Sequence, residues 1–251
     1  HDRRLRAAGY GGTVVRYDGA SWTAMDSGST RHLYGIWGSS SSDVFAVGHA
    51  GTILHYDGLA WTAMDSHTAK HLMGVWGGSS SDVFAVGYDG TILHYDGVAW
   101  TAMDSSTTQI LLAIWGSSPS DVFAVGYEGT ILHYDGAAWT AMNSGTTVRP
   151  YSVWGSSSSD VFAAGNGGSI LHYDGVAWTA MASGSVNRLY GVWGISSSDV
   201  FAVGDSGTIL HYREPVSTEV VSVTPGNGRW GDTLDIVIRG NNLKGATNLS
   251  F

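Results

Sequence analysis

The stretch Leu33–Ser66, LYGIWGSSSSDVFAVGHAGTILHYDGLAWTAMDS, is one copy of a unit that fills residues 12–212 with a period of 39 residues. Two tryptophan series mark the period: Trp37, Trp76, Trp115, Trp154 and Trp193, and Trp22, Trp61, Trp100, Trp139 and Trp178. A period of this length is typical of a solenoid, a propeller or another array, so the repeat decides the fold before any local pattern does.

Each unit contains four candidate strands. In the copy that starts at Leu72 they cover residues 72–76, 83–86, 91–95 and 100–103, and we name these positions a, b, c and d. All four are short, rich in β-branched and aromatic residues, and bounded by Gly, Ser or Asp. The links between them have hairpin lengths, and no 3.6-residue periodicity indicates a helix. One unit is therefore predicted to form one small antiparallel sheet.

Sheets of four strands repeated every ~40 residues and placed radially are the blades of a β-propeller. Position b is apolar throughout, as expected when both faces of a sheet pack on neighbouring sheets. The absence of helical patterns excludes a solenoid of helix pairs, and a 39-residue unit is longer than one coil of a parallel β-helix. The predicted fold class is an all-β propeller of four-stranded antiparallel blades.

The number of blades has two interpretations. Positions a and d occur five times, and positions b and c occur six times if the degenerate segment Leu5–Gly9 counts as a b strand. Six blades are expected, and favoured, if the first inner strand lies upstream of this chain. Five blades are expected if residues 190–193 complete the N-terminal sheet.

The turn between positions c and d carries a family resemblance. It contains Asp-Gly-x-x-Trp in the copies that start at Asp18, Asp57, Asp96, Asp135 and Asp174. This resembles the BNR/Asp-box-like propellers, which include sialidase-type enzymes and a photosystem-assembly factor, in the strand phase of WD-repeat propellers. The resemblance covers about 200 residues and implies the fold more strongly than the function.

A second module is predicted after the repeats. The propeller is expected to cover residues 1–214, and residues 215–251 resemble the start of an IPT/TIG domain, an immunoglobulin-like sandwich. Such a sandwich needs roughly 80–100 residues, so the segment is expected to be incomplete here.

Composition narrows the classes of function. The chain has no cysteine, which removes thiol catalysis, disulfides and Cys-type zinc sites. A net charge of −9 argues against nucleic acid as a partner. No apolar run is long enough to span a membrane. No cofactor and no metal are predicted, and oligomer formation is left open.

The copies differ mainly in two connectors, which join b to c and d to a. Because strand direction alternates within a blade, both connectors are expected on one face of the disc, and the a–b and c–d turns on the other. The d–a connector leads into the innermost strand, so its basic residues are expected around the mouth of the central channel. The candidate ligand-binding residues are Arg31, His32, His49, Lys70, His71, Tyr88, Tyr127, Arg149, Asn166 and Arg188. The alternative is relaxed drift of loop sequences.

Residues repeated in every copy are interpreted as structural. The histidines of position c, such as His94, are predicted to form hydrogen bonds between blades. The turn aspartates are predicted to form turns, and the repeated tryptophans to lie mostly in the core.

These patterns favour a non-catalytic binding module, in concrete terms a glycan-binding or adhesive propeller at a bacterial surface or secreted. Its predicted partner is a glycan or a surface protein on the connector-bearing face, and its predicted location is extracellular or at the cell surface. The alternative is a structural or assembly subunit of a larger surface complex. A sialidase-like hydrolase is a weaker alternative, because only Glu128 beside Tyr127 suggests its nucleophile pair.

Overall fold

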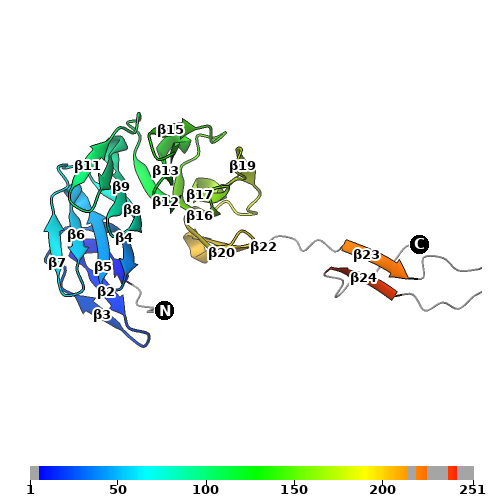
Figure 1. The fold of residues 1–251 in the computed structure, drawn as a ribbon, viewed down its shortest axis with the longest axis horizontal. Coiled ribbons are helices and arrows are strands. Elements are labelled where there is room, and N and C mark those ends of the chain that lie inside the picture. The colour runs from blue at the N-terminus through cyan, green and yellow to red at the C-terminus, as the bar shows by residue number, and fades with distance from the viewer. Residues whose placement is uncertain (1–5, 214–218, 225–236, 242–251) are drawn as a thin grey trace, which may run out of the picture. The chain divides into compact units, whose positions relative to one another are not determined.

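The chain divides into two compact units, His1–Tyr212 and Arg213–Phe251. The structure is a computed structural model, and it describes residues 6–213, 219–224 and 237–241. In the first unit, six antiparallel sheets follow one another along the chain (Figure 1). The first sheet comprises β1 (Arg6–Ala8), β2 (Val14–Tyr17) and β3 (Trp22–Met25).

Four sheets of four strands come next, and each takes its strands in chain order. Their bounds are β4 (Leu33–Ser40), β5 (Asp43–Gly48), β6 (Ile53–Tyr56), β7 (Trp61–Met64), β8 (Leu72–Ser79), β9 (Asp82–Gly87), β10 (Ile92–Tyr95), β11 (Trp100–Met103), β12 (Leu111–Ser118), β13 (Asp121–Gly126), β14 (Ile131–Tyr134), β15 (Trp139–Met142), β16 (Pro150–Ser157), β17 (Asp160–Gly165), β18 (Ile170–Tyr173) and β19 (Trp178–Met181). The sixth sheet comprises β20 (Leu189–Ser196), β21 (Asp199–Gly204) and β22 (Ile209–Arg213).

The predicted propeller fold is confirmed. Each four-stranded sheet is one 39-residue blade, and the first and last sheets have three of the four strands. The position-a strands of consecutive blades, β4, β8, β12, β16 and β20, pack beside one another. The degenerate segment near the N-terminus does form a strand, β1, and it pairs with β2. The five-blade interpretation is wrong, because β20 pairs with β21 in a sheet of its own and does not complete the first sheet.

The inner strand is longer than the sequence predicts. It extends to Ser79 in the second four-stranded blade, because Ser79 still pairs with Asp82 across a two-residue turn. Register shifts between Leu72 and Gly74 and between Gly77 and Ser79 accompany the extension. Such bulges bend a strand and increase its twist, so the Gly/Ser link that was predicted as a loop belongs mostly to the hairpin.

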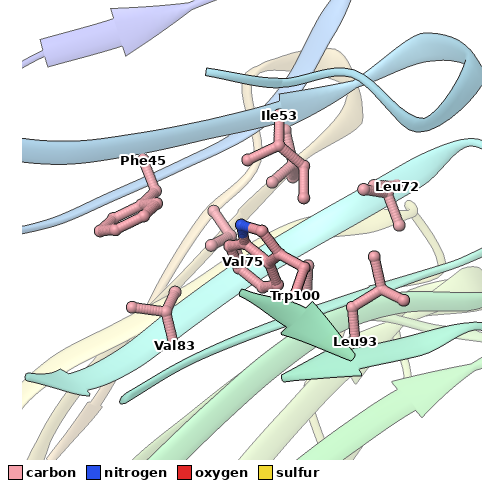
Figure 2. Packing of buried hydrophobic residues seen from close by; sticks show 9 residues of the cluster. Phe45, Ile53, Leu72, Val75, Val83, Leu93 and Trp100 are labelled. Carbon is pink, nitrogen blue, oxygen red and sulfur yellow. The ribbon is translucent and has the colours of Figure 1, made fainter. Parts of the chain in front are cut away.

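The core lies between the blades. Figure 2 shows one such layer, in which Phe45 and Ile53 of one blade meet Leu72, Leu93 and Trp100 of the next. The centroid of the Trp100 ring lies 6.1 Å from that of Phe45 at an interplanar angle of 78°. Edge-to-face contacts of this kind add to the burial of apolar surface. The same contact recurs in the next two blades. Trp139 packs on Phe84 of the preceding blade, and Trp178 packs on Phe123.

The position-a tryptophan makes the complementary contact. A Cβ atom added at Gly77 would lie 2.7 Å from Cη2 of Trp37 in the preceding blade. Real Cβ atoms do not approach other atoms this closely, so the glycine is what allows the indole to cover the inner strand of the next blade. The prediction that the repeated tryptophans lie mostly in the core holds for the interior blades, while Trp22 and Trp193 on the terminal sheets are exposed.

The repeated histidines form their hydrogen bonds within a blade, so the prediction of bonds between blades is wrong. Nε2 of His55 lies 2.7 Å from Oδ1 of Asp43, the first residue of β5 in the same sheet. The His55 ring also lies 4.4 Å from the Phe45 ring. Because the register pairs Phe45 with His55, the imidazole reaches the start of the neighbouring strand. The same pair recurs at His94, His133, His172 and His211.

Each connector between positions b and c is a three-residue 3₁₀ turn, an element that the sequence did not suggest. The second residue of the turn has a positive φ, for example 51° at Ala50 and 53° at Glu128. Left-handed backbone is unfavourable for a residue with a side chain, so backbone hydrogen bonds must hold these turns in place.

Of the second unit, the structure describes one antiparallel pair, β23 (Glu219–Thr224) with β24 (Val237–Asn241). The immunoglobulin-like assignment stays a prediction.

Candidate functional site

The b–c and d–a connectors lie on one face of the blades. Within a sheet, the backbone N–H of His49 donates to the carbonyl of His32 at 2.8 Å, and that of Asn166 donates to Arg149 at 2.9 Å. We call the surface formed by these two connectors the connector face. At the other end of the strands, the c–d turn lies beside the a–b turn, where a Cβ atom at Gly58 would meet Ser42. We call that surface the aspartate face.

Three histidines of the first blades gather on the connector face, and we call His32, His49 and His71 the imidazole cluster. The His49 and His71 rings lie 4.3 Å apart, and His32 lies 6.3 Å from His49. Nδ1 of His71 accepts the backbone N–H of Ala50 at 2.8 Å. Nδ1 of His32 likewise accepts the N–H of Gly11 at 2.8 Å. A nitrogen that accepts a hydrogen bond carries no proton, so both rings present Nε2–H as a donor.

Tyrosines surround the imidazole cluster. Tyr10 contacts the edge of His32 at 4.5 Å, and Tyr88 contacts His71 at 4.9 Å. Desolvation lowers the pKa of His49, and the nearby His71, Arg31 and His32 lower it further. Lys70 forms an ion pair with Asp89, so its charge is locally neutralised. This half of the connector face is therefore rich in aromatic rings and also carries the charge of Arg31.

The blades further along the chain carry a different cluster. The guanidinium carbon of Arg149 lies 3.3 Å from the centre of the Tyr127 ring and 5.8 Å from that of Tyr151. Nε of Arg188 donates to Oδ1 of Asn166 at 3.2 Å. A hydrogen bond with Tyr190 raises the pKa of Arg188 still further above its usual range. Arg149 is thus held by neutral rings, whereas Arg188 is held by Asn166 and Tyr190 and is also attracted by the charge of Asp205.

These residues border a shallow pocket of about 370 Å³. Its lining consists of Glu128, Thr147, Val148, Arg149, Tyr151, Asn166 and Arg188. Within the described part of the chain, no carboxylate forms an ion pair with Arg149 or Arg188, although Glu128 shares the pocket and the charge of Asp205 acts on Arg188. We call this set the arginine pocket. Two guanidinium groups on one rim are suited to an anionic group of a ligand.

The ten predicted site residues therefore form two groups. His32, His49, His71 and Tyr88 come together in one, with Arg31 and Lys70 beside them. Tyr127, Arg149, Asn166 and Arg188 form the other. Four further tyrosines at the site, Tyr10, Tyr34, Tyr151 and Tyr190, were not predicted from the connectors. Tyr34, Tyr151 and Tyr190 are the second residues of their inner strands. That residue also differs between copies, as Tyr, Met, Leu, Tyr and Tyr, and this variation was the available signal.

The aspartates of the c–d turns act in the backbone of the turn. Oδ1 of Asp96 accepts the N–H groups of Val98 and Ala99, each at 2.9 Å, and the other copies repeat these bonds. The bonds from Ala99 and Val98 lower the pKa of Asp96 below its ordinary value of 3.8, and equivalent bonds lower it at Asp18, Asp57, Asp135 and Asp174. Hydrogen bonds to the ionised form have this effect.

We expect these turns to make the stability of the folded chain depend on pH in the acidic range. Because the folded-state pKa is lowered, their contribution is fully present above pH 3.8 and is lost as the pH falls through the lowered value. The urea midpoint should therefore fall between pH 4 and pH 2. Replacing all five turn aspartates with Asn keeps an acceptor oxygen but removes the titration, so this variant should lose less stability over that range. An equal loss in both proteins would contradict the account.

A single substitution distinguishes a structural role of the turn aspartate from a role in ligand binding. Asp96→Ala is expected to destabilise the protein modestly, because two N–H groups lose their acceptor. Ligand binding at the connector face should not change. Thermal unfolding and a binding assay check the two parts separately, and a variant with lost binding and an unchanged melting temperature would contradict this role.

Within the described residues, no group of three or more His, Asp or Glu side chains is placed to hold a metal ion. Among the same residues, no helix is long and apolar enough to cross a membrane.

Comparison with known proteins supports the fold. No protein-family model matches the chain, and the search of curated proteins gave no match. Solved structures do match. YCF48 from Cyanidioschyzon merolae superposes with a TM-score of 0.65 at 17% identity, over 83% of this chain and 76% of that chain. A structure of YCF48 bound to D1 peptide gives a TM-score of 0.47 at 14% identity, over 85% and 89% of the two chains. At this identity the first match shows that the β-propeller fold is shared.

Proposed function

We propose that this chain is a non-catalytic binding module whose connector face recognises a carboxylate-bearing segment of a partner protein. The observation that carries the proposal is the arginine pocket, where Arg149 stacks on Tyr127 and Arg188 donates to Asn166. Neither guanidinium forms an ion pair in the described chain, although the charge of Asp205 also acts on Arg188. Charged groups that are already oriented lose little freedom when a ligand binds.

The contacts of the aromatic residues favour a peptide over the glycan that the sequence suggests. A sugar ring would need an exposed aromatic face. The face of Tyr127 is covered by Arg149, and Tyr88 packs against His71. The position-d tryptophans of the interior blades are buried. The face also carries exposed rings at Tyr10 and Tyr190. Its hydrogen-bond donors and guanidinium groups suit Asp or Glu side chains.

We also propose that the module does not catalyse a reaction. Tyr127 and Glu128 are adjacent in the sequence, but Arg149 covers the Tyr127 ring. Glu128 lies in the left-handed turn between β13 and β14, with φ at 53°. These contacts do not favour the hydrolase alternative.

We place the module outside the cell or at its surface, as a binding or assembly subunit, because the repeats and the following segment suggested that setting.

A peptide-display selection on the full chain tests the proposal. We expect the selected peptides to be enriched in Asp and Glu. The Arg149→Ala/Arg188→Ala double variant should bind a selected peptide at least about tenfold more weakly, which corresponds to about 1.4 kcal/mol.

The matched control is Asp135→Asn, which changes one charge on the aspartate face and should leave the affinity unchanged. Selected peptides without acidic residues, or equal binding by the double variant, would overturn the proposal.

A further inference from the structure

The imidazole cluster is part of a closed circuit of rings on the connector face. The centroid of the His49 ring lies 4.3 Å from that of His71 and 6.3 Å from that of His32. Tyr34 contacts both outer rings, at 6.5 Å from His32 and 6.4 Å from His71. Desolvation raises the pKa of Tyr34, and two neighbouring tyrosines raise it further. The cluster is therefore partly shielded from water.

Backbone hydrogen bonds fix the tautomers of the two outer histidines. Nδ1 of His32 accepts the N–H of Gly11, and Nδ1 of His71 accepts the N–H of Ala50, each at 2.8 Å. Both N–H groups belong to left-handed residues of the b–c turns, with φ at 62° and 51°. Nε2 of each neutral ring therefore carries a proton and has no lone pair for a metal ion. The two rings offer donors, which suit the oxygen atoms of an anion.

His49 is the imidazole of the cluster that is free to change its charge. Within the described residues, its ring nitrogens form no hydrogen bond. A proton on Nδ1 of either outer ring would instead remove the acceptor of a backbone N–H. Desolvation lowers the pKa of His49 from its ordinary value of 6.5, and the nearby His71, Arg31 and His32 lower it further. The ring is thus neutral at about pH 7.5, and an anion beside it would favour the uptake of a proton.

The charges around the cluster suit a ligand with a single negative charge. Arg31 acts electrostatically on His49 and forms no ion pair within the described residues. Lys70, next to His71 in the sequence, already pairs with Asp89. One available cation matches a carboxylate better than a phosphate, which carries up to two negative charges. The other titratable groups around His49 are His32, His71, Tyr10, Tyr34 and Tyr88.

We propose that the imidazole cluster is a second carboxylate site on the connector face, and that it strengthens the binding of an acidic segment as the pH falls from about 7.5 to about 5.5. The inference rests on the proposed function for the nature of the partner, but it uses other residues than the arginine pocket. Glutamate side chains, with an ordinary pKa of about 4.3, keep most of their charge over this range.

The direction of the pH dependence follows from linkage. A bound carboxylate favours the protonated form of His49, so the pKa of this residue is higher in the complex than in the free chain. The gain in affinity is complete below the pKa of free His49, which lies under 6.5. It is lost as the pH rises through the higher pKa of the complex.

The test uses the full chain, an acetylated peptide of six Glu residues, and a peptide of six Gln residues as the uncharged control. Proton NMR follows the pKa of His49, whose signal is identified by its through-space contact with the His71 ring. We expect the Glu peptide to raise this pKa and the Gln peptide to leave it unchanged. Affinity for the Glu peptide should rise at least about threefold from about pH 7.5 to about pH 5.5, and His49→Gln should lose this gain.

His67→Asn is the matched control. His67 lies in the same d–a connector as His71, but it pairs with Asp65 instead of joining the cluster. Asn tolerates the positive φ of 54° at this position. This variant should keep the gain in affinity at the lower pH.

Three results would overturn the inference: an unchanged pKa of His49, a full gain in His49→Gln, or tighter binding of inorganic phosphate than of the Glu peptide. Equal affinity of Arg149→Ala/Arg188→Ala and the unchanged chain for a peptide from the display selection would instead refute the proposed function, so the two failures are distinguishable. The NMR titration uses the unchanged chain and decides the outcome if His49→Gln does not fold.

Discussion

Replacing Trp100 with Ala is expected to lower the free energy of unfolding by about 3–5 kcal/mol. Trp100 is 2% exposed and packs between two blades against Phe45 and Tyr95. Removal of the indole loses apolar burial and leaves a cavity that the paired strands on either side cannot close. Denaturant unfolding followed by far-ultraviolet circular dichroism measures the loss.

The matched control is Trp22→Ala, which removes the same residue from the same repeat position in the first blade. Trp22 is 52% exposed because no blade precedes it in the described structure. We expect this variant to lose less than about 1 kcal/mol, in the range of ordinary surface substitutions. Equal losses at the two positions would mean that packing between blades is not what stabilises the fold.

Gly90→Ala is the second change with a large expected effect. Gly90 has φ +67°, and a Cβ atom there would lie 1.9 Å from the carbonyl oxygen of Thr107. Left-handed backbone costs a residue with a Cβ about 1–2 kcal/mol. The overlap with a backbone atom should add about 1–3 kcal/mol, because the b–c turn and the d–a connector must separate.

Gly145→Ala isolates the first of these two costs. Gly145 has φ +68°, and nothing lies within 4 Å of the added Cβ atom. Its loss should therefore be close to that of the left-handed backbone alone. Denaturant unfolding of both variants should show the larger loss at Gly90, and equal losses would contradict the close contact between the two connectors.

The fold could be predicted from the sequence because one pattern of strands and turns is written several times. The 39-residue spacing of the tryptophans fixed the blade, and hairpin-length links fixed its antiparallel order. The contacts of His55 could not be predicted in the same way. Alternation along a strand says which side a residue takes, but only the register, which pairs Phe45 with His55, places the imidazole beside Asp43 in its own sheet.

The candidate site could be predicted as a face but not as a set of contacts. Comparison of the copies singled out Arg149 and Arg188, since arginine at these positions departs from Ile110 in an otherwise similar blade. The division into an imidazole cluster and an arginine pocket depends on which blades are neighbours and on how side chains stack across them. That Tyr127 packs under Arg149 follows from side-chain geometry, which the pattern of residues along one chain does not contain.

Amide hydrogen exchange of the full chain, with and without an acidic peptide from the display selection, tests the central claim most directly. The account predicts protection of the b–c and d–a connectors of the blades that carry the arginine pocket, around Tyr127, Arg149, Asn166 and Arg188. Protection confined to the c–d and a–b turns of the aspartate face would contradict it.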